Sequence, residues 1–199
     1  MTGLVRSTST RFVFRLPRSD TSFDVTHVKE VETCTILEIA CLLTDGNLET
    51  VIHGPEIVIH HSEEVLAGMN DWCIEHHGKS GLTQRVREST VSLQEAETQV
   101  LTFVQRYTLP GCVHLAGNSV HCDLSFLKRY MPNLAAHLHY RIVDVSSVRE
   151  LARRWFPNDM RKAPRKELRH TAKADILESL TELKWLRKTV FKTRGGGRD

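Results

Sequence analysis

From residue 36 onward, apolar runs of the length of buried strands alternate with longer amphipathic stretches. Residues 36–43 are apolar apart from Glu38 and lead into a turn at 44–47, which indicates a buried strand. Residues 92–107 carry apolar side chains at helical spacing, which indicates an amphipathic helix. Alternating strands and helices predict an α/β domain in which helices pack on a sheet.

The remaining segments extend this pattern, and no internal repeat interrupts it. Further strands are expected at residues 48–60, with an interruption near Gly54-Pro55, and at 113–116 and 140–145. Further helices are expected at 62–77, from about Asp123 to Pro132, at 146–155 and from near Ala172 to Val190. A length of 199 residues suits one such domain.

The first 35 residues differ from the rest. Up to Arg18 they hold four arginines, several serines and threonines and no acid, a composition that resembles a mitochondrial transit segment. A flexible basic arm without function fits the composition equally well. We expect an atypical, disordered basic segment at 1–35, the folded domain at 36–192 and a disordered glycine-rich tail at 193–199.

Composition narrows the class of protein. A net charge of +3 permits an anionic ligand without requiring one. No stretch approaches the roughly 20 apolar residues of a membrane span, which favours a soluble protein. The five cysteines form no C-x-x-C pair, so we expect buried reduced thiols in an intracellular protein rather than a zinc site or disulfide framework.

Two acids stand where α/β folds place their sites. Asp123 lies at an expected strand-to-helix transition, where it is either a functional carboxylate or an ordinary helix cap. His170 precedes the last expected helix and Asp175 lies within it, an arrangement that suits a mobile general base beside a metal-bound carboxylate. A surface histidine and an unrelated aspartate would give the same spacing.

A third segment, residues 138–147, offers side chains suited to phosphate oxygens. It contains Tyr140, Arg141 and Ser146, and arginine can bind phosphate through two parallel hydrogen bonds. An ordinary strand flanked by polar residues would have the same sequence pattern.

Taken together, these segments resemble the oligoribonucleases of the DEDDh exonuclease class, nearly end to end from residue 36 to 192. Several short motifs occur in the family's order: Asp71-Trp72, HHGKSGL at 76–82, AGNS at 116–119, KRYMP at 128–132, HYR at 139–141, DVS at 144–146 and RRW at 153–155.

The resemblance implies an RNase H-like exonuclease fold, with a mixed sheet flanked by helices, that works as a homodimer. It implies 3′→5′ hydrolysis of short single-stranded oligoribonucleotides to nucleoside 5′-monophosphates by two Mg²⁺ or Mn²⁺ ions. Asp123 and Asp175 match metal-binding catalytic acids, and His170 matches the general base. Ala174 stands where the family commonly has a second aspartate.

The resemblance also implies a grip on both ends of a very short substrate. The residues that match the 5′-phosphate cap are Ser119, Tyr140, Arg141 and Ser146. Tyr140 is also among the expected catalytic residues, and it and Arg141 are expected to reach across the dimer. The residues that match contacts with the terminal bases are Leu4, Trp72 and His77, where stacking contributes roughly 1–3 kcal/mol per base.

The family's first motif is the main departure. In the family, the first strand carries an Asp-x-Glu pair directly before Met-Thr-Gly-Leu. This sequence begins with Met-Thr-Gly-Leu at residues 1–4. We therefore expect the first strand to be missing or replaced, with 12–14 as the one apolar run nearby that could pair in its place. The acids at Glu30 and Glu32 leave too short a connection to the next strand to substitute.

Loss of two of four carboxylates predicts a weakly active or inactive enzyme. The alternatives are an inactive protein that binds short RNA or dimerises, and a product that folds poorly and has no function. We expect an intracellular protein located in mitochondria, in the cytoplasm or in both.

Overall fold

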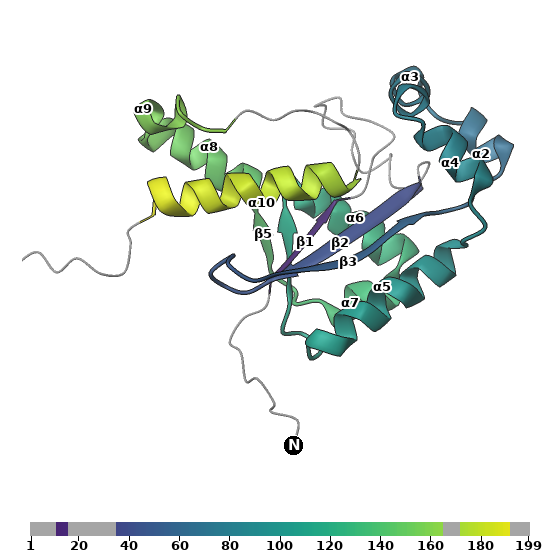
Figure 1. Ribbon diagram of the computed structural model, residues 1–199, viewed down its shortest axis with the longest axis horizontal. Coiled ribbons are helices and arrows are strands. Elements are labelled where there is room, and N and C mark those ends of the chain that lie inside the picture. Colours follow the sequence, from purple (N-terminus) through teal and green to yellow (C-terminus); the bar gives the residue numbers. More distant parts are fainter. Residues whose placement is uncertain (1–10, 16–34, 165–171, 192–199) are drawn as a thin grey trace, which may run out of the picture.

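The computed structural model describes residues 11–15, 35–164 and 172–191. The described strands form one five-stranded sheet in the order β3-β2-β1-β4-β5 (Figure 1). Their bounds are β1 Arg11–Arg15, β2 Glu38–Thr44, β3 Val51–Val58, β4 His114–Gly117 and β5 Ile142–Asp144. β2 runs antiparallel to β1 and β3, whereas β4 runs parallel to β1 and β5. The expected mixed sheet is confirmed.

The helices of the described part lie between and around these strands. Their bounds are α2 Glu63–Ala67, α3 Asp71–Lys79, α4 Leu82–Glu88, α5 Leu93–Tyr107, α6 Val120–Tyr130, α7 Pro132–His137, α8 Val145–Trp155, α9 Pro157–Met160 and α10 Ala172–Thr189. A capping box formed by Ser92 and Glu95 opens α5, where the sequence predicts a helix.

Both faces of the sheet are buried. Every residue of β2 is buried, and its side chains alternate between two cores because successive residues of a strand point to opposite faces. Ile39, Cys41 and Leu43 pack with α5, α6 and α7, whereas Ala40 and Leu42 pack with α8 and α10. Figure 1 shows α5 and α7 on one side of the sheet and α10 on the other. A strand covered on both faces explains the nearly unbroken apolar run in the sequence.

The centre of the sheet is β1, which lies between β2 and β4. Phe12 is opposite Leu43 of β2 on one side and Leu115 of β4 on the other. The expectation that the apolar run at 12–14 replaces a strand is confirmed, although these residues belong to the segment that the sequence sets apart from the domain. Pairing on both sides gives the backbone groups of β2 and β4 partners that they would otherwise lack.

The prediction of a single helix at 62–77 is wrong, because the structure has two helices there. α2 ends at Gly68, and Asn70 starts α3 by accepting a hydrogen bond from the Cys73 backbone N–H at 2.9 Å. Asparagine is among the strongest N-cap residues, so it begins a new helix where the apolar pattern alone continues the old one. The other expected elements occur within a few residues of their predicted bounds.

Four cysteines lie in the described part, all as free thiols, and Cys41, Cys73 and Cys122 among them are buried. Burial raises the pKa of the Cys41 thiol to about 12, which keeps it protonated and unreactive. Among the described helices, none has both the length and the apolar character needed to cross a bilayer.

Gly54→Ala is expected to destabilise the fold. A Cβ on Gly54 would clash with Cys41 Sγ and lie 2.5 Å from Phe103 Cε1, beside the irregular pairing of β2 with β3. Overpacking of this kind costs about 1–3 kcal/mol in the free energy of unfolding, which chemical denaturation measures. Gly78→Ala is the control, because a Cβ there meets nothing within 4 Å in α3, and it should stabilise by roughly 0.5–1 kcal/mol. Equal changes in the free energy of unfolding at the two positions would contradict the close packing around Gly54.

Candidate active site

The carboxyl ends of β4 and β5 form one edge of the sheet. The strands are parallel, and Gly117 at the end of β4 lies opposite Asp144 at the end of β5. α6 and α8 begin within a few residues of these ends, so the N-terminal ends of two helices meet at this edge. Backbone N–H groups and polar side chains therefore gather here, as is usual for sites in α/β folds.

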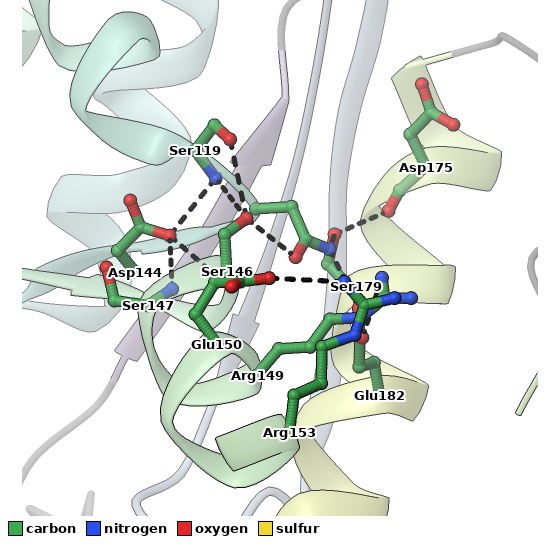
Figure 2. Close-up of polar contacts among 11 residues, drawn as sticks. Ser119, Asp144, Ser146, Ser147, Arg149, Glu150, Arg153, Asp175, Ser179 and Glu182 are labelled. Carbon is green, nitrogen blue, oxygen red and sulfur yellow. Dashed lines mark hydrogen bonds and ion pairs between the residues drawn. The ribbon is translucent and has the colours of Figure 1, made fainter. Parts of the chain in front are cut away.

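Asp144 holds the two strand ends together. One carboxylate oxygen, Oδ1, accepts hydrogen bonds from the backbone N–H groups of Ser146 at 2.9 Å and Ser147 at 3.4 Å, which caps α8. The same oxygen accepts from the Ser119 N–H at 3.1 Å. Its other oxygen, Oδ2, lies 3.2 Å from His121 Nδ1. The capping carboxylate thereby fixes the turn before α6 as well as the start of α8 (Figure 2).

Two of the predicted phosphate-binding serines lie side by side. The Ser119 N–H donates to Ser146 Oγ at 2.9 Å, and the two hydroxyl oxygens are 3.4 Å apart. Ser119 adopts a left-handed conformation with φ of 52°, a strained geometry for a serine that a helix N-cap rarely shows. Backbone strain of this kind gathers at ligand sites, which favours a binding role for this turn.

Asn118 connects these serines to α10, and sequence reasoning assigned it no role. Its Oδ1 accepts from Ser146 Oγ at 3.1 Å, and its Nδ2 donates to Ser179 Oγ at 2.9 Å and Glu182 Oε2 at 3.2 Å. Glu182 is also ion-paired with Arg149 at 3.2 Å. The only sequence signal was the position of Asn118 directly before Ser119.

The two predicted metal-binding acids are both buried and lie in the first turns of helices. Asp123 is 1% exposed on α6, and Asp175 is 7% exposed on α10. The alternative that Asp123 is an ordinary N-cap is wrong, because Ser119 holds that position. The Ser179 hydroxyl donates to the backbone oxygen of Asp175 at 2.8 Å, and Figure 2 shows the Asp175 carboxylate directed away from this contact.

Both of these helices contact β1. The sequence of β1 is Arg-Phe-Val-Phe-Arg, so the central strand brings no carboxylate to the site. Among the described residues, no three His, Cys, Asp or Glu side chains gather closely enough to hold a metal ion. Within the part of the chain that the structure describes, the two buried aspartates are the predicted acids that could supply oxygen ligands to a hard cation.

Glu38, at the start of β2, is a further buried carboxylate near α10. It is fully buried, and its two oxygens accept from Arg85 Nη1 at 3.1 Å and from the Ala172 backbone N–H at 3.2 Å. Ala172 is the first residue of α10, three residues before Asp175. Sequence reasoning gave Glu38 no role beyond its place in a strand.

Tyr140 and Arg141 lie at the other end of β5 from Ser146. The three residues of β5 separate them from the serine cluster, about 10 Å of strand. Tyr140 is 75% exposed, and Arg141 Cζ lies 5.1 Å from the centre of its ring. The His139 ring stacks on Tyr140, and His139 Nδ1 accepts from the Arg141 N–H at 3.0 Å. The side chains of Tyr140 and Arg141 are thus exposed and separated by the length of β5 from the two serines of their own chain.

The remaining predicted site residues are only partly placed. His77 is buried in α3, at 4% exposure. Trp72 lies on the same helix, and its side chain is outside the described part of the chain. Leu4, His170 and the acids Glu30 and Glu32 also lie outside the described residues.

Comparison with known proteins gives one consistent result. A family model described as exonuclease matches residues 21–183. The chain is 52% identical over 165 residues to the mitochondrial oligoribonuclease of Mus musculus, covering 83% of this chain and 70% of that protein. It is 53% identical over 163 residues to the probable oligoribonuclease of Dictyostelium discoideum, covering 82% of this chain and 85% of that protein.

Solved structures with a similar fold are also nucleases. The RNase domain of the yeast Pop2 protein has a TM-score of 0.63 at 14% identity, covering 91% of this chain and 77% of that one. Exonuclease I of E. coli in complex with a dT13 oligonucleotide has a TM-score of 0.64 at 15% identity, covering 92% of this chain and 42% of that one. At these identities the likeness concerns the fold alone.

Asn118→Asp is expected to destabilise the protein more than Asn118→Ala does. Alanine removes the three hydrogen bonds and lowers the free energy of unfolding by about 1–3 kcal/mol. Aspartate would place a second carboxylate against buried Glu182, where like charges repel. Urea denaturation at neutral and at acidic pH measures both, and the excess cost of aspartate should shrink as the carboxyls become protonated. An Asp variant as stable as the Ala variant at neutral pH would contradict this geometry.

Proposed function

The chain belongs to the oligoribonuclease family of exonucleases, and from this membership we propose that it binds short oligoribonucleotides as a 3′→5′ exoribonuclease with a low hydrolytic rate. The products are nucleoside 5′-monophosphates. The observation that carries the proposal is the convergence at one sheet edge of two buried aspartates on α6 and α10 with the paired hydroxyls of Ser119 and Ser146.

In this proposal Asp123 and Asp175 hold Mg²⁺ or Mn²⁺. Their burial in the first turns of α6 and α10, the two helices that contact β1, supports the assignment. A bound ion supplies polarisation of the phosphodiester and a lower pKa for its water. His170, two residues before the start of α10, is the proposed base that takes the proton of that water.

The 5′ phosphate is proposed to bind at Ser119 and Ser146. Tyr140 and Arg141 complete this cap from a second copy of the chain, since within one chain they lie at the far end of β5. Such an arrangement requires a homodimer. Trp72, His77 and Leu4 are proposed to contact the terminal bases, so that the fixed separation of the two ends selects very short RNA.

The low rate follows from the sequence of β1. The family's first strand supplies two acids, and β1 occupies the central place of the sheet with no acid among its five residues. Two aspartates leave a second hard cation without ligands. A mitochondrial location is proposed from the basic composition of 1–18 and from the mitochondrial relatives, with the cytoplasm as the other site.

Turnover of a labelled diribonucleotide with Mn²⁺ is expected to be more than about 100-fold below that of a complete family member. Loss of outer-shell partners alone lowers activity at metal sites roughly 10–100-fold, and here ligands themselves are replaced. A steady-state assay of the purified protein measures this. Turnover comparable to that of the complete enzyme would refute the impairment.

A paired gain-of-function experiment localises the defect to β1. Val13 and Arg15 lie opposite Leu42 and Ala40, whose side chains pack on the α10 side of the sheet. Val13→Asp with Arg15→Glu should therefore raise turnover. Phe12→Asp with Phe14→Glu is the control, because these positions lie opposite Leu43 and Cys41 on the other face, and it should only destabilise the fold.

A second candidate function is RNA binding without hydrolysis, favoured by the acid-free β1 beside an intact serine cluster. Arg141→Ala should weaken binding of a 5′-phosphorylated dinucleotide by roughly 10- to 100-fold, because it removes a charge-assisted contact with phosphate. Equilibrium titration measures the change. Arg129→Ala is the matched control, since Arg129 is also exposed and stacked over a tyrosine at 5.5 Å but lies on α6. Unchanged binding by the Arg141 variant would dismiss the assignment.

A further inference from the structure

Glu38 joins three parts of the fold that lie far apart in the sequence. Its carboxylate sits at the first residue of β2 and is fully buried. One oxygen accepts from Arg85 on α4, and the other accepts from the backbone N–H of Ala172, 134 residues away. A buried carboxylate needs a counter-charge and hydrogen-bond donors, and here it has one of each. The buried carboxylate of Glu38 is therefore compensated by its two partners.

The bond to Ala172 fixes where α10 begins. The first N–H groups of a helix have no partner within the helix, and Glu38 satisfies one of them while its negative charge lies at the positive end of the helix dipole. Asp175 lies three residues further along, in the same first turn. In the sequence His170 stands two residues before Ala172. Asp175 thus lies within one helical turn of the anchored position.

A second contact at the start of α10, the ion pair between Lys173 and Glu56, is weaker than the bond from Glu38. Lys173 lies 2.9 Å from Glu56 of β3, but both side chains are largely exposed, at 56% and 38%. Exposed ion pairs contribute little because water and salt screen them. The buried bond from Glu38 therefore contributes more to the position of this turn than the exposed pair does.

We propose that Glu38 is a positioning residue that holds the first turn of α10, and with it Asp175, in the geometry that metal binding requires. Through Arg85 the same carboxylate ties this turn to α4, next to the helix that carries Trp72 and His77. The part of this inference that concerns the metal rests on the proposed function.

Glu97 provides a matched control within the same chain. It is also a buried glutamate, 6% exposed, and it accepts from the Asn133 N–H at 2.7 Å and the Leu134 N–H at 3.0 Å at the start of α7. Both glutamates anchor a helix start, but α7 carries none of the proposed site residues. Glu38→Ala and Glu97→Ala should therefore both lower the free energy of unfolding. Only an effect that Glu97→Ala does not share reports on the position of α10.

The first measurement is amide hydrogen exchange across α10 in the full chain. Glu38→Ala should speed exchange in the first turn at least about tenfold, as expected for a turn that opens locally. Glu97→Ala should leave that turn unchanged and affect α7 instead. Glu38→Gln should retain most of the protection, because its amide oxygen still accepts from Ala172. Unchanged exchange in the Glu38→Ala protein would overturn the proposal.

The second measurement is Mn²⁺ affinity by electron paramagnetic resonance, with the metal alone and no RNA. Glu38→Ala should weaken binding by about tenfold or more, and both Glu38→Gln and Glu97→Ala should stay near the wild-type value. Equal affinity in the wild type and Glu38→Ala would overturn the positioning role. Failure of the wild type itself to bind Mn²⁺ would instead count against the proposed function, while hydrogen exchange still decides how α10 is anchored.

Discussion

The structure depends on the backbone hydrogen bonds of one strand, β1, which lies between β2 and β4. These two strands border the site from opposite sides, β2 through Glu38 and β4 through the turn that contains Asn118 and Ser119. Without a strand between them, each would expose a row of unpaired N–H and C=O groups in the middle of the sheet. β1 also contacts α6 and α10, the helices of Asp123 and Asp175, so the distance between the two acids depends on the strand that separates β2 from β4.

Strand pairing and catalysis make different demands on the central strand. Hydrogen bonds between strands use backbone groups that every residue except proline supplies, so the sequence Arg-Phe-Val-Phe-Arg completes the sheet. Metal binding needs carboxylate oxygens at two positions of that strand, and no backbone group replaces them. A chain of this family can therefore keep its sheet intact with a central strand that carries no acid.

The helix α10 is bonded to the rest of the chain at several points along its length. Near its start it is bonded to Glu38, and further along Glu182 bonds Asn118 and pairs with Arg149. Near its end Arg187 donates to the Asn47 backbone oxygen at 2.7 Å. Small residues at the contact face let the helix approach the sheet closely: Ala40, Ala116 and Ala172. The acid Asp175 is thus carried on a helix that is bonded to the rest of the chain near both of its ends.

The sequence by itself determined the order of strands and helices, the double-sided burial of β2, the replacement strand at 12–14 and, through its family motifs, the pair Ser119 and Ser146. These follow from local periodicity and short motifs, which are properties of neighbouring residues. Only the tertiary structure decided that Asn70 divides one expected helix into two, that the length of β5 separates Tyr140 and Arg141 from the serines of their own chain, and that Glu38, Asn118 and Glu182 bond distant segments around the site. The contacts of the last three residues reach across as many as 134 residues of sequence, and a buried acid or amide reveals its partner only when the chain has brought the two together.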